Sequence, residues 1–126
     1  MKAVSRPVYL DLRRMRLPLP GWVSILHRIS GVLLFLAFPA SVWGLSISLA
    51  SEAGFQALAS LLQHPYAKIL LVALAWAFTH HFFSGLRHLA LDAHRGVGLR
   101  QARMTGVAVV AASGAITLAF AGCLFA

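Results

Sequence analysis

Three long uncharged runs restrict this chain more than any other feature of its sequence. They extend over residues 29–50, 69–86 and 104–125, and none contains Asp, Glu, Lys or Arg. A helix needs about 20 apolar residues to cross a hydrocarbon core of about 30 Å. The first and third runs meet this length, and the second reaches it if it begins at Pro65 and Lys68 snorkels to the interface. The runs are apolar on all sides, which argues against the alternating pattern of a barrel.

The composition excludes a soluble or disordered chain. Hydrophobic residues make up 60% of the 126 residues and charged residues 11%, against about half and about a quarter in ordinary soluble domains. So few charges cannot cover the surface of a soluble protein of this size. We therefore predict an all-α fold in a single membrane-anchor domain, residues 1–126. It has a basic N-terminal segment at 1–28 and transmembrane helices at about 22–50, 65–91 and 104–125. Pro39 predicts a kink in the first helix.

The positive charges predict the topology. The net charge is +8, and six Lys or Arg residues lie within residues 1–28. The loop between the first two helices has none, whereas the second loop region carries Arg87, Arg95, Arg100 and Arg103. By the positive-inside rule the N-terminus is cytoplasmic and the C-terminus periplasmic, in a multi-pass protein of a bacterial inner membrane. Membrane topology and attraction to anionic lipid account for the positive charge. We therefore expect a lipid bilayer as the partner, and no nucleic acid.

Histidines in the second helix are the first functional candidates, because ionisable residues inside membrane helices are costly. His81 and His88 are seven residues apart and share a helical face with Gly85. His80 instead shares a face with Ser84 and Arg87. Histidine is a common axial ligand of haem iron. The spacing favours His81 over His80 only modestly, and the alternative is that both histidines simply hydrogen-bond to neighbouring helices. His64, in the first loop, is expected to be solvated.

A polar face at the start of the first helix is the second candidate. Ser24, His27, Arg28 and Gly31 follow the spacing i, i+3, i+4, i+7 and so lie on one face. A hydroxyl, an imidazole and a guanidinium can together donate hydrogen bonds to carbonyl oxygens or carboxylates. The alternative is that Arg28 only anchors the helix at the interface and Ser24 caps it.

Three segments resemble a known family when they are taken together. They are residues 6–12 (RPVYLDL), residues 24–31 (SILHRISG) and the pattern His81-x3-Gly85-x-Arg87-His88-x3-Asp92. In this combination the chain resembles the cytochrome b membrane-anchor subunits of succinate dehydrogenase, respiratory complex II. The resemblance covers essentially the whole chain, including its length, basic N-terminus, three helices and topology.

The resemblance implies a cofactor, a substrate site and partners. This chain would form half of a two-subunit helical bundle that binds haem b, with His81 as an axial ligand of the iron. His27, Arg28 and His88 would lie at the haem propionates, and Ser24, His27 and Arg28 at the ubiquinone-reduction site. The other half of the bundle is a second small anchor subunit, and an iron–sulfur subunit and a flavoprotein subunit complete the complex. The roles of His80 and Asp92 stay open.

The function implied is the passage of electrons from succinate oxidation to quinone, in a subunit with no catalytic centre of its own. One alternative is a fumarate reductase anchor that works in the quinol-to-fumarate direction. The other is a membrane scaffold without a redox role, which explains the hydropathy but not the two polar clusters.

Overall fold

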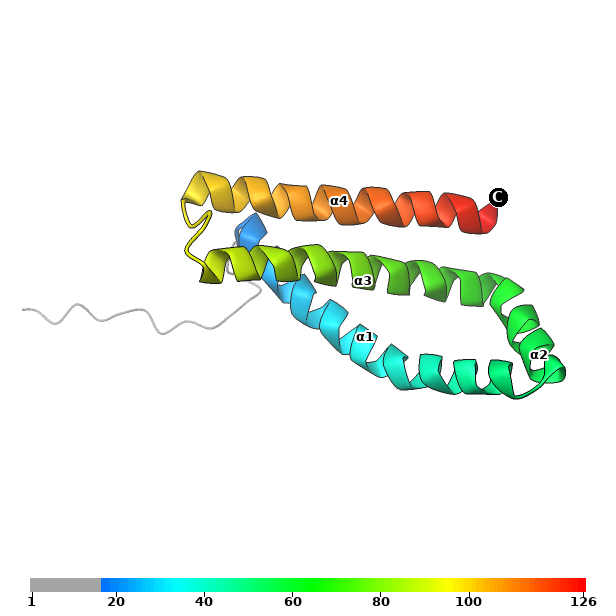
Figure 1. Ribbon diagram of the computed structural model, residues 1–126. Coiled ribbons are helices and arrows are strands. Elements are labelled where there is room, and N and C mark those ends of the chain that lie inside the picture. Colours follow the sequence, from blue (N-terminus) through cyan, green and yellow to red (C-terminus); the bar gives the residue numbers. More distant parts are fainter. Residues whose placement is uncertain (1–16) are drawn as a thin grey trace, which may run out of the picture.

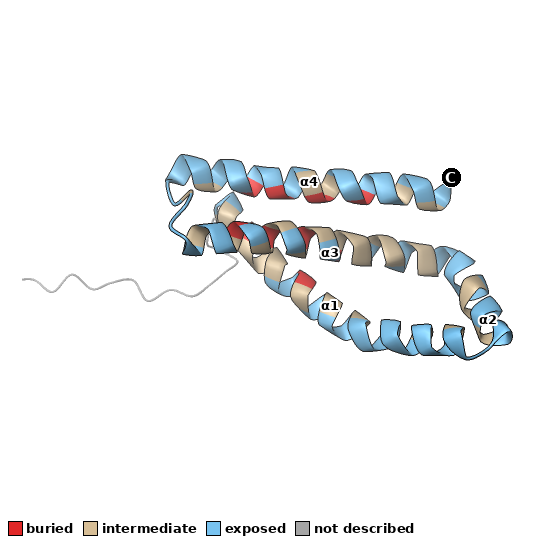
Figure 2. Ribbon diagram, in the orientation of Figure 1, coloured by how far each residue is buried: buried red, intermediate tan, exposed pale blue. Residues whose placement is uncertain are grey.

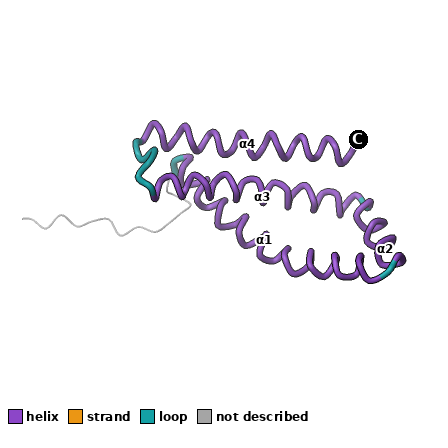
Figure 3. Tube along the Cα trace, viewed as in Figure 1, coloured by secondary structure: helices purple, strands orange, loops and turns teal. Residues whose placement is uncertain are grey.

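The described part of the chain, residues 17–126, is a bundle of helices (Figures 1 and 3). In this computed structural model the helices are α1 (Leu19–Ala50), α2 (Glu52–Gln63), α3 (Pro65–Asp92) and α4 (Leu99–Phe125). Three of them, α1, α3 and α4, are long and apolar enough to cross a membrane. The prediction of an all-α fold with three transmembrane helices is confirmed. The motif at residues 6–12 and the basic residues up to Arg16 lie outside the described residues.

The two ends of the bundle differ in character. One end holds the start of α1 and the α3–α4 loop, residues 93–98, and we call it the arginine-rich end because Arg28, Arg87, Arg95, Arg100 and Arg103 lie at or near it. The other end holds α2 and the C-terminus (Figure 1). The helix α3 runs antiparallel to α1 and to α4 and packs against both.

The helix α1 begins at a proline pair and bends along its length. Pro18 takes an extended conformation as the N-cap and Pro20 lies in the first turn, where its missing N–H removes no helical hydrogen bond. Pro39 lies inside the helix, where the ring interrupts the hydrogen-bond ladder. The helix changes direction partway along, and its second half diverges from α3 (Figure 1).

The helix α2 lies within the segment that the sequence analysis treated as a loop. The Ser51 hydroxyl caps it by accepting a hydrogen bond from the Gly54 N–H at 3.0 Å. Glu52 in the first turn suits the helix dipole and accepts a hydrogen bond from Gln56 at 2.8 Å. At 12 residues α2 is too short to cross a membrane and instead joins α1 to α3.

The turn from α1 into α2 depends on the lack of a side chain at Gly54. A Cβ atom at this position would collide with the backbone carbonyl of Ile47 in α1. The contact is with backbone, so a rotamer change cannot relieve it. The Gly54→Ala variant is therefore expected to destabilise this corner by about 1–3 kcal/mol.

The measurement for Gly54→Ala is the thermal unfolding temperature of the purified complex. Gly44→Ala is the matched control, because a Cβ at Gly44 would meet only Leu58 at an ordinary distance of 3.8 Å. A lower unfolding temperature for Gly54→Ala than for Gly44→Ala is expected. Equal unfolding temperatures would show that the corner is not close-packed.

The buried residues of the bundle are mostly small or polar, whereas large apolar side chains face outward. The buried positions line the facing sides of α3 and α4 and the part of α1 that approaches them (Figure 2). They comprise Val23, Ser30, Ala77, His80, Ser84, Arg87, Gly106, Val109, Ser113 and Thr117. Lipid is as apolar as Leu or Phe, so helices in a membrane associate through small residues and interhelical hydrogen bonds. The outward-facing Leu, Phe and Val side chains are suited to contact with lipid or partner subunits.

Lys68, at the start of α3, reaches the C-terminal end of α4. Its Nζ donates a hydrogen bond to the Leu124 carbonyl at 2.9 Å and lies 5.6 Å from the ring centroid of Phe125. A cation at the last carbonyls of α4 interacts favourably with the negative end of that helix dipole. Lys68 therefore joins the start of α3 to the end of α4.

Candidate functional site

Three histidines from two helices come together near the arginine-rich end. The imidazoles of His27 in α1 and His81 in α3 stack with ring centroids 4.2 Å apart and an interplanar angle of 12°. His88 lies two turns further along α3, with its ring centroid 4.8 Å from that of His27. All three are half-buried. The two polar clusters identified in the sequence thus meet at one place between α1 and α3.

His81 is held against the backbone of α1 by one edge of its ring. Its Nδ1 lies 3.0 Å from the carbonyl oxygen of His27 and 3.3 Å from the hydroxyl of Ser30. The Ser30 hydroxyl itself donates to the same His27 carbonyl at 2.9 Å. Within residues 17–126, no hydrogen-bond partner is found for the opposite nitrogen, Nε2 of His81.

His80, next to His81 in the sequence, lies inside the bundle. It is 1% exposed and stacks on Trp76 with ring centroids 5.3 Å apart. Its Nε2 and the hydroxyl of Ser84, one turn along, are both buried without a hydrogen-bond partner in the described part of the chain. The two adjacent histidines therefore face different surroundings: His80 is enclosed by the bundle, whereas His81 remains partly accessible.

The residues of the polar face of α1 do not all have the same surroundings. His27 and Gly31 face α3, and a Cβ at Gly31 would lie 2.9 Å from Cε1 of His81. Ser24 is half-buried, whereas Arg28 is exposed. Arg28 lines a shallow, mostly apolar hollow together with Ile29, Val32 and Leu33. An arginine at the mouth of an apolar hollow provides donors for an oxygen of a ligand whose remainder is apolar.

His88 and Gly85 complete the α3 side of the cluster. The Nδ1 of His88 donates to the Ser84 carbonyl of its own helix at 2.8 Å, which leaves Nε2 for another partner. A Cβ at Gly85 would lie 3.6 Å from Nε2 of His27. The face of α3 at Gly85 is thus partly covered by the His27 ring.

Comparison with known proteins identifies the family. Residues 2–120 match the model of the succinate dehydrogenase/fumarate reductase transmembrane subunit. The chain belongs to this family. Curated relatives include the succinate dehydrogenase cytochrome b556 subunits of Coxiella burnetii, Paracoccus denitrificans and Rickettsia typhi. The first is 40% identical over 70% of this chain and 71% of the relative. The second is 32% identical over 86% and 84%, and the third 33% identical over 90% and 89%.

The comparisons confirm the resemblance found in the sequence. They also confirm the prediction that the chain is a membrane-anchor subunit of succinate dehydrogenase. The family consists of transmembrane subunits, and the three long apolar helices of this chain agree with that description.

Two charged residues of this anchor subunit lie away from the histidine cluster. Arg87 is only 8% exposed and packs against α4. Its Nε donates to the Thr105 hydroxyl at 3.1 Å and its Nη2 to the Ala102 carbonyl at 3.5 Å. Asp92 is exposed at the end of α3. Arg87 therefore connects the two helices that the α3–α4 loop joins.

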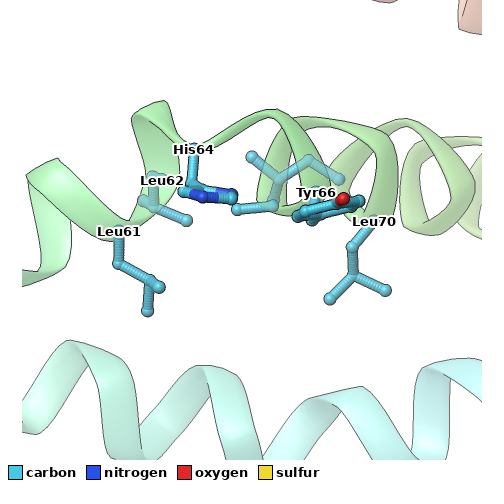
Figure 4. A pocket seen from close by; sticks show the side chains of 7 residues that line it. Leu61, Leu62, His64, Tyr66 and Leu70 are labelled. Carbon is cyan, nitrogen blue, oxygen red and sulfur yellow. The ribbon is translucent and has the colours of Figure 1, made fainter.

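A second hollow lies at the opposite end of the anchor subunit, where α2 meets α3 (Figure 4). Its lining is apolar apart from His64 and Tyr66, whose rings stack with centroids 5.3 Å apart. The remaining lining residues are Leu61, Leu62, Ala67, Leu70 and Leu71. It includes none of the predicted site residues, and His64 is exposed as expected.

Ser30 and Gly31 have structural roles in the cluster that were not predicted from the sequence. Ser30 was noted only as part of a motif, and Gly31 only as a member of the polar face of the first helix. The signal that could have identified them is their position one turn after His27, where a small residue lets α3 approach closely. No group of three or more His, Cys, Asp or Glu within residues 17–126 has the arrangement of a metal site.

Proposed function

We propose that this anchor subunit supplies one axial ligand, His81, to a haem b shared with a second small anchor subunit. It also forms part of the site at which quinone receives electrons derived from succinate. The observation that carries the proposal is the hydrogen bonding of His81 Nδ1 to α1. It leaves Nε2 without a partner among the described residues. Metal-ligating histidines characteristically donate their other ring N–H to a carbonyl or carboxylate. His80 is 1% exposed, stacked on Trp76 and enclosed between helices, so neither of its ring nitrogens is accessible to a haem.

The residues around His81 suit a haem with its propionates toward the arginine-rich end. Bound there, the haem supplies one-electron redox chemistry. His88 offers Nε2, His27 its imidazole and Arg28 its guanidinium as donors to carboxylates at this level of the bundle. These three side chains would orient the haem and offset the negative charge of its propionates.

The quinone site is proposed at the hollow beside Arg28. Ubiquinone has a polar head with two carbonyl oxygens and an apolar tail, which matches a guanidinium beside Ile29, Val32 and Leu33. Donors aimed at a carbonyl oxygen stabilise the negative charge that develops there during reduction. Arg28 provides the charged donor, Ser24 lies one turn before it on α1, and His27 directly precedes it. A partner subunit would close the open side of the hollow.

The complex around this chain follows from the same proposal. The second anchor subunit completes the haem site, and the iron–sulfur and flavoprotein subunits attach on the cytoplasmic side of a bacterial inner membrane. The arginine-rich end is cytoplasmic in this arrangement, with the N-terminus inside and the C-terminus in the periplasm. Succinate-to-quinone is the proposed direction. The fumarate reductase direction is kept as an alternative because the family model covers both enzymes.

The experiment that tests the proposal is a dithionite-reduced-minus-oxidised absorbance spectrum of the purified complex. A b-type haem band in stoichiometric ratio to the flavin is expected. A complex that oxidises succinate but shows no haem band would contradict the haem proposal. A complex with neither haem nor quinone reductase activity would favour the non-redox scaffold.

A further inference from the structure

The Nδ1 edge of His81 specifies which ring nitrogen carries the proton. We infer that the backbone of α1 fixes His81 as the Nδ1–H tautomer and that Gly31 is the positioning residue that makes this contact possible. The inference rests on the proposed role of His81 as a haem ligand. A carbonyl oxygen can only accept a hydrogen bond, so the nitrogen 3.0 Å from the His27 carbonyl oxygen has to carry the proton.

Ser30 reinforces this assignment. Its hydroxyl proton is used in the 2.9 Å hydrogen bond to the His27 carbonyl, so its oxygen faces Nδ1, at 3.3 Å, as an acceptor. The His81 Nδ1–H is therefore shared between two acceptors on α1. Ser30 is fully buried, which keeps water from replacing either contact. With the proton on Nδ1, the lone pair of the ring is on Nε2.

Gly31 determines how closely the His81 ring approaches α1. A Cβ at this position would lie 2.9 Å from Cε1 and 3.4 Å from Nδ1 of His81. Cε1 is the ring carbon between the two nitrogens, so a methyl group there pushes the whole edge of the imidazole away from the helix. The Nδ1–H···O contact to the His27 carbonyl would lengthen, and hydrogen bonds weaken with distance and misalignment.

Loosening this contact has a predictable electronic effect. A hydrogen bond from the remote N–H raises the basicity of a ligating imidazole. A more basic axial ligand donates more electron density and stabilises the oxidised iron, so the reduction potential is lowered. The Gly31→Ala variant should therefore raise the haem midpoint potential and shift the gmax of the low-spin EPR signal. If Gly31 had only a packing role, its substitution would change neither the midpoint potential nor gmax.

The test compares Gly31→Ala with Gly44→Ala in the purified complex. Both substitutions add one methyl group to α1, but the one at Gly44 meets only Leu58 at 3.8 Å. The haem-to-flavin ratio, the midpoint potential and gmax are measured for each. A raised potential and a shifted gmax in Gly31→Ala, with wild-type values in Gly44→Ala, are expected. Wild-type values in Gly31→Ala at full haem content would overturn the inference.

Ser30→Ala covers the case in which Gly31→Ala fails to assemble. It removes one hydroxyl and adds no atoms, so the haem is expected to be retained with a shifted gmax. An unchanged gmax in Ser30→Ala would then overturn the inference.

His81→Ala separates this inference from the proposed function. If His81→Ala keeps the wild-type haem spectrum, His81 is not the ligand and the proposed function fails. If His81→Ala loses the haem while Gly31→Ala and Ser30→Ala match the wild type, the ligand assignment stands and the positioning inference fails.

Discussion

Replacing His81 by alanine is expected to remove the b-type haem band from the assembled complex. The His81 imidazole is held against the backbone of α1 by Nδ1, and its Nε2 has no partner among the described residues. Alanine offers no ligand, and the neighbouring imidazole of His80 is buried inside the bundle, stacked on Trp76. The expected result is a haem-to-flavin ratio near zero, or a haem spectrum that is strongly altered.

His80→Ala is the discriminating control for this prediction. His80 is buried, so its loss leaves a cavity expected to cost roughly 2–5 kcal/mol of stability, as for other large buried side chains. The haem spectrum should nevertheless be retained. Loss of the haem in His80→Ala together with its retention in His81→Ala would reverse the assignment of the two histidines.

Replacing Arg28 by alanine is expected to impair quinone reduction selectively. A charge-assisted hydrogen bond contributes about 1.5–3 kcal/mol, which corresponds to a loss of roughly 10- to 100-fold in the kcat/KM for quinone. Succinate oxidation with an artificial acceptor that takes electrons upstream should stay near the wild-type rate. The reason is that Arg28 is exposed beside an apolar hollow of the anchor, whereas the proposed complex oxidises succinate on a separate flavoprotein subunit.

Arg100→Ala is the matched control for Arg28→Ala. Arg100 is also an exposed arginine at the arginine-rich end, but it lies in the first turn of α4 and not beside the hollow. The Arg100→Ala variant should leave both quinone reduction and succinate oxidation near the wild-type rate. Equal losses in both assays for Arg28→Ala would indicate a defect of assembly and count against a quinone role.

The helices themselves could be predicted from the sequence because three uncharged runs have few alternatives. Their ends were less predictable. The helix α4 begins at Leu99, before the apolar run that starts at Met104, because its arginines can reach the interface from a helical backbone. The helix α2 was missed because its formation depends on the Ser51 cap and on a close turn at Gly54, and not on apolar length.

The faces of the helices could be predicted only in part. Helical spacing separated His80 from His81, and the structure places them in different surroundings. Spacing did not indicate that Arg87 packs against Thr105, because the sides of α3 that face α4 and α1 are not distinguished by hydrophobicity. A helix that is apolar all round gives no moment from which its rotation can be derived. The small residues at the contacts, such as Gly31 opposite His81, carry that information instead.

An experimental map of the assembled complex tests the central claim most directly. This claim predicts iron within bonding distance of Nε2 of His81, with Nδ1 still facing the His27 carbonyl and His80 still stacked on Trp76. Iron bound to His80 or to His27, or a haem held without any ligand from this chain, would contradict it.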